Sequence, residues 1–287
     1  MKKIVLSLIA VFCLSFLASA AKVDTLEIKS AAMDRTLRAA VAIPESYAKS
    51  KGRYPVLYLL HGAWGHFNDW LKKTPNANAV KALADQYNII IVMPEGEAFS
   101  FYIDSPTLKS SQFETFVSRE VVAKIDGTYR TIANKNGRAI TGLSMGGHGA
   151  MYLSVRHPDL YCAAGSMSGA LDMGTIRKLE SEAETNKMFR AVYGDVPPTD
   201  AELRSHAVIG MVSKFKANNM PMIIDIGVDD FLIESNREFH RRLVYEKVPH
   251  DYTERPGAHT WQYWQDALPY QVLFFSKVFE ANGSSVK

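Results

Sequence analysis

Apolar and polar positions alternate in two neighbouring stretches near the start of the chain, residues 23–29 and 36–43. Alternation with a period of two is typical of strands that bury one face and expose the other. The residues between the two stretches, 31–34, form a short connection that ends in an aspartate, a residue suited to turns. The pattern therefore predicts an antiparallel β-hairpin at the beginning of the fold.

Further along, the chain contains short and mostly apolar runs, as expected for strands that are covered on both faces. These runs are residues 56–60, 89–93, 138–140, 163–165 and 222–226. Segments with the period of an α-helix lie between or after them, and the clearest are residues 113–129, 146–156, 234–246 and 260–279. Strands and helices that alternate in this way predict an α/β fold, with a mostly parallel central sheet, an antiparallel N-terminal hairpin and helices on both faces.

Residues 171–216 interrupt this alternation. The segment is polar, has a helical pattern and is punctuated by glycine and proline around residues 194–198. We interpret it as an insertion over the sheet, either a lid above an active site or a peripheral pair of helices. The 287-residue chain is 47% hydrophobic, enough for a sizeable core, so residues 21–287 are expected to form one domain.

The first twenty residues have the composition of a signal peptide. Lys2 and Lys3 precede an apolar run over residues 4–17, and three small residues at 18–20 follow it. The run is too short to span a bilayer comfortably, and no stop-transfer segment comes after it. We therefore predict a signal peptide at residues 1–20, a secreted or periplasmic mature chain that begins near Ala21, and no stable membrane insertion.

Charge and cysteine content narrow the possible partners. Lys2 and Lys3 supply two charges of the formal net charge of +3, and no acidic residue precedes Asp24, so the mature chain is close to +1. Nothing in this balance favours nucleic acid or an anionic membrane as a partner. Cys162 is alone in the mature chain, which excludes an internal disulfide, and its apolar surroundings predict a buried side chain. The oligomeric state is left open.

A candidate nucleophile lies between a predicted strand and a predicted helix. The sequence Gly-Leu-Ser-Met-Gly at 142–146 fits the pattern G-x-S-x-G, and Gly147 follows it. In such a junction the serine has a strained backbone, and its hydroxyl is exposed at the N-terminus of the helix. Because the strand, the glycines and the helix all accompany the motif, we predict that Ser144 is a nucleophile rather than part of an ordinary turn.

A serine hydroxyl needs a general base, and in this kind of fold the acid and the histidine follow the serine along the chain. Six histidines follow Ser144, and His259 has the most suitable position, between the last predicted strand, about 251–254, and the final helix. A loop there can bring the imidazole over the serine. His250 is the reserve candidate, and His148, His157 and His240 are interpreted as structural or solvated.

The acid is expected in the loop that follows the predicted strand 222–226, where Asp229 and Asp230 are adjacent. A carboxylate there would orient His259 and stabilise its protonated form. From the residues alone both aspartates are candidates, and both would also suit a turn or a helix cap. Asp225 lies within the apolar strand itself and is interpreted as a structural carboxylate.

The remaining requirement is an oxyanion hole. In this fold one donor is the backbone N–H of the residue after the nucleophile, here Met145, and the other comes from the loop after an early strand. The loop 61–65 directly follows the predicted strand 56–60 and contains two glycines, which allow its backbone to turn. We therefore predict that the N–H of Ala63 is the second donor.

The loops expected around this site are rich in aromatic residues. These side chains can stack on sugar or phenolic rings, or they can pack within the loops. The candidates for substrate binding are Trp64, Trp70, Tyr102 and Trp261, with Phe67, Phe99 and Phe101 in the same loops. His61 and His66 look like a metal pair only in isolation, because no helix with a carboxylate accompanies them. The sequence therefore predicts no metal and no cofactor.

Together these motifs resemble the esterase D-like family of α/β-hydrolases, and the resemblance covers nearly the whole mature chain. The matching segments are His61-Gly62-x-x-Gly65 through Asp69-Trp70, Phe101-Tyr102-x-Asp104, 142–147, Asp230-Phe231-Leu232 and Pro256-Gly257-x-His259-x-Trp261. That family includes S-formylglutathione hydrolases, tributyrin-type esterases, feruloyl and acetylxylan esterases, and mycolyltransferases. In its pattern the triad acid stands immediately before the Phe-Leu pair, which implies Asp230 rather than Asp229.

The resemblance implies a serine esterase that hydrolyses carboxylic esters through an acyl-enzyme. Because an exported enzyme does not meet cytosolic thioesters, we expect small-molecule or polysaccharide esters with short or aromatic acyl groups, such as acetyl or feruloyl. The polar composition of residues 171–216 argues against a channel for long lipid chains. Two alternatives are an acyltransferase of the mycolyltransferase type, with a sugar hydroxyl in place of water, and a non-catalytic binding protein on a hydrolase scaffold.

Overall fold

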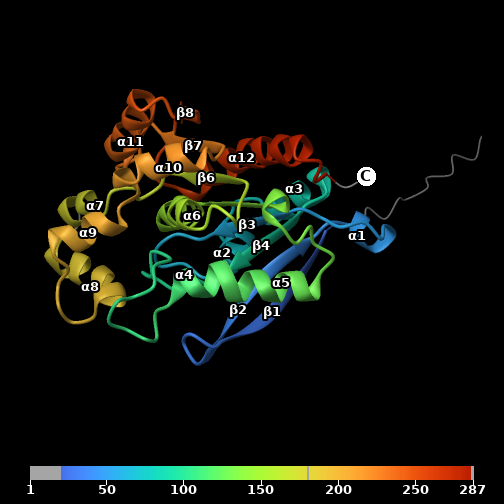
Figure 1. Ribbon diagram of the computed structural model, residues 1–287, viewed down its shortest axis with the longest axis horizontal. Helices are drawn as coiled ribbons and strands as arrows, with labels where there is room; N and C mark the ends of the chain where they lie inside the picture. The colour runs from blue at the N-terminus through green and yellow to red at the C-terminus, as the bar shows by residue number, and fades with distance from the viewer. Residues whose placement is uncertain (1–20, 180, 286–287) are drawn as a thin grey trace, which may run out of the picture.

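A single mixed β-sheet runs through the centre of the computed structural model, which describes residues 21–179 and 181–285 (Figure 1). The strand order is β1-β2-β4-β3-β5-β6-β7-β8. The pairs β1–β2 and β2–β4 are antiparallel, and the other pairs are parallel. The strands are β1 (Lys22–Ser30), β2 (Arg35–Ile43), β3 (Val56–Leu60), β4 (Ile90–Pro94), β5 (Arg138–Gly142), β6 (Ala163–Met167), β7 (Met222–Gly227) and β8 (Asp251–Arg255).

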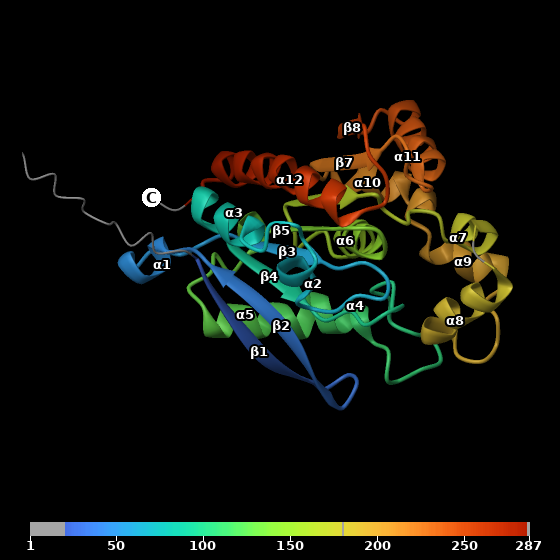
Figure 2. The same ribbon diagram turned by 180° about the vertical axis from the view of Figure 1, so that it is seen from behind.

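The predicted α/β fold is confirmed. The N-terminal hairpin β1–β2 forms one edge of the sheet, as Figure 2 shows from behind. Each predicted apolar run begins at, or one residue before, the first residue of a strand. The predicted signal peptide lies outside the described residues. Cys162 is buried, as its apolar surroundings predicted, and it forms no disulfide with another described residue.

Helices cover both faces of the sheet. Two of them, α3 and α12, pack together on one face, while α6, α11 and the α4–α5 segment cover the other. The α-helices are α1 (Ser46–Lys49), α2 (Asp69–Lys72), α3 (Ala79–Tyr87), α4 (Phe113–Thr115), α5 (Val122–Thr128), α6 (Met145–Arg156), α7 (Met173–Leu179), α8 (Glu182–Tyr193), α9 (Asp200–His206), α10 (Val212–Asn218), α11 (Ile233–Tyr245) and α12 (Trp261–Ala281).

Successive residues of the buried strands serve opposite faces of the sheet. In β3, Leu57 and Leu59 belong to the core under α3 and α12, whereas Tyr58 and Leu60 belong to the larger core on the other face. All four side chains are fully buried. Because side chains alternate across a strand, a strand between two helical layers must be apolar throughout, which is why these runs carried no alternation in the sequence.

Two helical features differ from the expectation. Helix α3 was not predicted, although Val80, Leu83 and Ala84 form its short buried stripe and Asn88 ends it in the left-handed conformation, with φ 50°. The predicted helix over 113–129 exists, but its middle, η1 (Phe116–Val121), is a π-helical turn. Hydrophobic periodicity does not distinguish such a turn, because only the hydrogen-bond spacing changes.

The segment 171–216 folds into four short helices, α7 to α10, and a 3₁₀ turn, η3 (Val208–Gly210). In Figure 1, α7, α8 and α9 lie together at one end of the molecule. Local signals define their starts: Ser181 caps α8, and Thr199 with Glu202 forms a capping box at α9. Each cap contributes about 1 kcal/mol to helix stability. The helical pattern predicted for this segment is therefore present.

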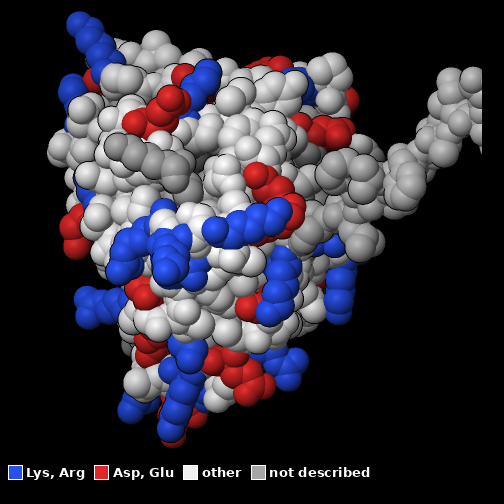
Figure 3. Space-filling view, turned by 90° about the vertical axis from the view of Figure 1, so that its right-hand side faces the viewer, with Lys and Arg blue, Asp and Glu red and all other residues white. Residues whose placement is uncertain are grey.

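Charges of both signs share the surface. On the face shown in Figure 3, Lys and Arg side chains are interspersed with Asp and Glu side chains. Within residues 21–179 and 181–285, no helix combines the length and apolar character needed to cross a bilayer.

Candidate active site

Ser144 stands at a sharp junction between β5 and α6. Its backbone has φ 54° and ψ −118°, a conformation that L-residues rarely adopt. The turn leaves no room for a side chain at either of its glycines. A Cβ on Gly142 would lie 2.5 Å from the Gly146 backbone, and a Cβ on Gly146 would lie 2.5 Å from the carbonyl oxygen of His61. The two glycines of the G-x-S-x-G motif thus let the strand turn into the helix and present the serine hydroxyl at its N-terminus.

His259 and Asp230 complete a hydrogen-bonded array with this serine. Ser144 Oγ lies 2.9 Å from His259 Nε2, and His259 Nδ1 lies 2.8 Å from Asp230 Oδ2. A carboxylate accepts, so Nδ1 carries the proton and Nε2 is free to accept the serine hydroxyl proton. The carboxylate is itself held, because Asp230 Oδ1 accepts a hydrogen bond from the Leu232 N–H at 2.9 Å. This arrangement is that of a nucleophile, a general base and an orienting acid.

The imidazole is also fixed by aromatic neighbours. The Phe231 ring lies 4.5 Å from the His259 ring, centroid to centroid, and the Trp264 ring lies 4.8 Å away at nearly a right angle. Trp264 is anchored in turn, since its Nε1 donates to Ser168 Oγ at 3.1 Å. The histidine is therefore held between two rings as well as by its carboxylate.

Of the two adjacent aspartates, the structure brings only Asp230 to the histidine. Asp230 is 2% exposed, whereas Asp229 is exposed, and its backbone N–H donates to the Gly257 carbonyl oxygen. That backbone bond ties the loop after β7 to the loop that carries His259. Asp229 thus serves the loop through its main chain and not through its carboxylate.

A buried polar cluster supports the same loop from beneath. The Asp225 carboxylate accepts hydrogen bonds from Tyr263 on α12 and from Arg255 at the end of β8. Burial raises the pKa of Asp225, and the two donors act against that shift by favouring the charged carboxylate. The interpretation of Asp225 as a structural carboxylate therefore agrees with its contacts.

The reserve candidate, His250, lies elsewhere. Its Nε2 is 2.8 Å from His240 Nδ1. His148 is fully buried, its two ring nitrogens contact the carbonyl oxygens of Phe101 and His206, and burial lowers its pKa to about 4. Neither ring has a hydrogen bond to Ser144, so the choice of His250 as a reserve was wrong.

The two predicted oxyanion donors line the same cavity as Ser144. Ala63 lies in the loop after β3, and Met145 is the first residue of α6. Within the described part of the chain, neither backbone N–H donates a hydrogen bond to a protein acceptor. Two uncommitted N–H groups beside a serine hydroxyl are suited to stabilise the negative oxygen of a tetrahedral intermediate.

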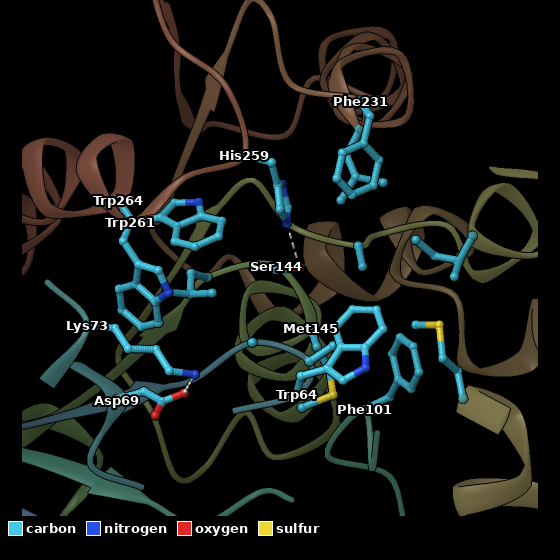
Figure 4. Close-up of a pocket in the computed structure, with 17 residues that line it drawn as sticks. Trp64, Asp69, Lys73, Phe101, Ser144, Met145, Phe231, His259, Trp261 and Trp264 are labelled. Carbon is cyan, nitrogen blue, oxygen red and sulfur yellow. Dashed lines mark hydrogen bonds and ion pairs between the residues drawn. The ribbon is translucent and has the colours of Figure 1, made fainter. Parts of the chain in front are cut away.

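The cavity around Ser144 has a volume of about 260 Å³, near the lower end of the range for small-molecule sites. Most of its lining side chains are apolar, and two charged residues, Asp69 and Lys73, lie at one side (Figure 4). The apolar lining consists of Ala63, Trp64, Phe101, Leu143, Met145, Ala170, Ile176, Met188, Phe231, Leu232, Trp261 and Trp264. The site is a compact, mostly apolar pocket over an activated serine.

Residues 30–275 match the Esterase family model, described as "Putative esterase". The chain belongs to this esterase family.

Several named proteins are similar to this chain. The acetyl esterase of Caldicellulosiruptor saccharolyticus is 28% identical over 229 residues, which is 77% of this chain and 83% of that protein. The diacylglycerol acyltransferase/mycolyltransferase Ag85B of Mycobacterium leprae is 25% identical over 285 residues, which is 84% of this chain and 80% of that protein. A solved ferulic acid esterase superposes with a TM-score of 0.77 at 29% identity, covering 90% of this chain and 98% of that one.

The structure divides the aromatic residues predicted to bind substrate into two groups. Trp64 and Trp261 line the cavity. Trp70 and Tyr102 do not, and their prediction as substrate-binding residues was wrong: Trp70 is 1% exposed and donates to the Leu60 carbonyl oxygen, and Tyr102 is fully buried. The Tyr102 hydroxyl donates to the His61 carbonyl oxygen. Both rings support the loop after β3 from within.

Sequence reasoning also missed residues that line the cavity. Lys73 follows the short helix α2, and Phe231 and Trp264 are neighbours of the catalytic loops. Phe231 directly follows Asp230, so adjacency to the acid was a usable signal. Lys73 had no such signal, because only the fold brings α2 against the start of α12.

The polar composition of residues 171–216 was misleading about the lining of the cavity. Ile176 on α7 and Met188 on α8 are each 5% exposed, and both line the cavity, while the polar residues of these helices lie mostly on the outside. The argument that this segment lacks apolar surface for a substrate was therefore wrong. Whether the segment moves as a lid stays a prediction.

The histidines considered as a metal pair have other partners. His61 Nδ1 donates to the Gly62 carbonyl oxygen, and its Nε2 accepts from the Gly96 N–H, so both ring nitrogens are occupied. Among residues 21–179 and 181–285, no group of three or more His, Cys, Asp or Glu side chains is arranged to hold a metal ion.

Proposed function

We propose that this chain is a serine esterase that hydrolyses carboxylic esters through an acyl-enzyme on Ser144. The observation that carries the proposal is the array Ser144–His259–Asp230, with hydrogen-bond distances of 2.9 and 2.8 Å, in one cavity with two uncommitted N–H groups. A non-catalytic binding protein would have no need of all these parts, and any of them could be lost without affecting its binding.

The reaction proceeds in two steps. Ser144 Oγ attacks the ester carbonyl carbon while its proton passes to His259 Nε2, and the N–H groups of Ala63 and Met145 stabilise the oxyanion. The carbon–oxygen bond to the alcohol then breaks, and His259 returns the proton to the departing oxygen. Water repeats the attack on the acyl-enzyme and releases the acid, with Asp230 stabilising the imidazolium in both steps.

For the substrate, we propose short or aromatic acyl groups esterified to carbohydrate, such as acetyl or feruloyl esters. A cavity of about 260 Å³ has room for a small acyl group or a single ring. Similarity to an acetyl esterase and to a ferulic acid esterase supports the same size class.

Transfer of the acyl group to a sugar hydroxyl is the second candidate function, because the acyltransferase Ag85B is similar over 84% of this chain. The same triad would serve, with a sugar hydroxyl in place of water in the second step. Adding a soluble sugar to the assay separates the two: a transferase gives an acylated sugar as the main product, and a hydrolase gives free acid.

We also propose export, with cleavage before Ala21. The Ala21 backbone nitrogen lies 2.8 Å from Asp85 Oδ2, and Ala21 is 4% exposed. Cleavage of the peptide bond before Ala21 would turn this nitrogen into an ammonium group that is already paired with the Asp85 carboxylate. N-terminal sequencing of the native extracytoplasmic protein is expected to begin near Ala21, and recovery of Met1 would contradict this.

The central test is to trap the acyl-enzyme. We expect 4-nitrophenyl acetate to give a burst of nitrophenolate, and mass spectrometry of the quenched protein to find the acetyl group on the peptide that contains Ser144. A panel of acetyl, butyryl, feruloyl and palmitoyl esters then ranks kcat/KM for the acyl groups. Acylation of another residue would reject the mechanism, and preference for palmitoyl would reject the proposed substrate class.

A further inference from the structure

The cavity has two chemically different sides, which meet at Ser144. Figure 4 shows Phe101 and Phe231 on one side of the serine, and Trp261, Lys73 and Asp69 on the other. We call the first the apolar side, formed by Phe101, Ile176, Met188 and Phe231, and the second the polar side, formed by Asp69, Lys73 and Trp261. An ester has two parts, an acyl group and an alcohol, so each side of the cavity can bind one of them.

The charged pair on the polar side has unused hydrogen-bonding capacity. Lys73 Nζ lies 2.8 Å from Asp69 Oδ2, which also accepts from the His66 N–H. The ammonium has three N–H groups and uses one of them in this pair. Within the described residues, Asp69 Oδ1 accepts no hydrogen bond from a protein group. The pair therefore retains donors on the ammonium and an acceptor at Asp69 Oδ1, and both residues line the cavity.

Helix stability alone does not account for this placement. An exposed ion pair four residues apart on a helix contributes only about 0.3–0.5 kcal/mol. Here the Asp69 side chain is 6% exposed, and the Lys73 side chain is 45% exposed, at the wall of an apolar cavity. The Asp69 carboxylate is thus largely withdrawn from water, and its hydrogen bonds from Lys73 and from the His66 N–H both go to Oδ2, which leaves Oδ1 for another polar group, such as a substrate hydroxyl.

Trp261 supplies an aromatic surface beside this pair. Its ring packs edge-on against Trp70 and against Trp264, each with a centroid distance of 5.4 Å, and the residue is half-buried. The buried Trp70 thus fixes the plane of a ring that lines the cavity. A rigid ring next to hydrogen-bond donors and acceptors is the combination that recognises a sugar, whose faces carry C–H groups and whose rim carries hydroxyls.

We propose that Lys73 and Asp69, with Trp261, form the subsite for the alcohol part of the substrate and bind hydroxyl groups of a sugar ring. Lys73 donates to one hydroxyl oxygen, and Asp69 Oδ1 accepts from a neighbouring hydroxyl, while the acyl group occupies the apolar side. The inference rests on the proposed esterase function and adds to it the residues that select the alcohol.

The test changes the pair and leaves the triad untouched. Lys73→Met removes the ammonium, and the double variant Asp69→Asn with Lys73→Met removes both charges without leaving a buried carboxylate unpaired. Lys72→Met is the matched control, because Lys72 is the adjacent exposed lysine and does not line the cavity. Thermal unfolding of each variant identifies any loss of folded protein.

The readout is a ratio of two specificity constants for the same acyl group. We expect Lys73→Met and the double variant to lower kcat/KM for an acetylated methyl xyloside about tenfold more than kcat/KM for 4-nitrophenyl acetate, mainly through KM, since a lost hydrogen bond to a charged group has this magnitude. Lys72→Met should leave the ratio at the wild-type value. An unchanged ratio in both folded Lys73 variants would overturn the inference.

A second series assigns the two sides. Methyl acetate, methyl butyrate and methyl ferulate share one small alcohol, so loss of the Lys73–Asp69 pair should affect them to the same extent. A selective loss for the feruloyl ester would place the acyl group on the polar side and overturn the assignment. If the wild-type protein hydrolysed none of these esters, the proposed esterase function would fail first, which distinguishes the two failures.

Discussion

The triad loops and the segment 171–216 line the same cavity, but they are positioned in different ways. Ser144, Asp230 and His259 follow β5, β7 and β8, which lie in the parallel part of the sheet, and the strand register fixes where each loop begins. Ile176 and Met188 belong to short helices that pack mainly on one another. We infer that the edge of the sheet determines the chemistry and that the helical segment determines which acyl group fits.

This difference has a physical basis. The carboxyl ends of parallel strands meet at one edge of a sheet, so residues far apart in the sequence converge there without local design. Helices α7 and α8 form no part of the strand ladder, and their contribution is a wall of apolar side chains. A substitution in the triad should therefore abolish turnover, whereas one in the wall should change the selectivity.

The largest effect is expected for Ser144→Ala, which removes the nucleophile and very little volume. The value of kcat/KM for 4-nitrophenyl acetate should fall by about 10⁴-fold or more. Circular dichroism should remain unchanged. Near-wild-type turnover with an intact spectrum would mean that the chemistry does not lie at this edge of the sheet.

The next effect separates the two adjacent aspartates. Asp230→Asn should lower kcat by about 10³- to 10⁴-fold, because the amide no longer holds His259 in the tautomer that accepts the serine proton. Asp229→Asn keeps the backbone bond to Gly257 and should leave kcat close to the wild-type value. Steady-state kinetics on both variants decide the matter, and the reverse ranking would assign the acid to Asp229.

A smaller effect is expected in the helical wall. Ile176→Phe fills part of the apolar side and should lower kcat/KM for butyryl and feruloyl esters about tenfold relative to acetyl esters. Leu179→Phe is the control, since Leu179 lies one turn further along α7, is 49% exposed and does not line the cavity. Equal losses for all acyl groups would show that α7 does not select among them.

The smallest effect is expected for His250→Gln. His250 contacts His240 away from the cavity, so kcat/KM should not change. Loss of that hydrogen bond should lower the free energy of unfolding by about 1 kcal/mol, measurable by urea denaturation. A large loss of activity in folded protein would restore His250 as a candidate base.

The sequence by itself determined the order of the strands along the chain and the residues of the triad. Buried strands must be apolar on both faces, and the turn at Ser144 tolerates little besides glycine at 142 and 146, so both leave strong local patterns. The choice between Asp229 and Asp230 needed the family resemblance, since both have the same chemistry and positions one residue apart.

The tertiary structure alone decided which aromatic and charged residues reach the cavity. Trp70 and Trp261 are both tryptophans in loops near the site, yet Trp70 is buried beneath Trp261 and only Trp261 lines the cavity. Likewise, composition described residues 171–216 as polar, while Ile176 and Met188 turn inward from them. Which face of a short helix or loop is covered depends on neighbours distant in the sequence, and a local pattern does not contain that information.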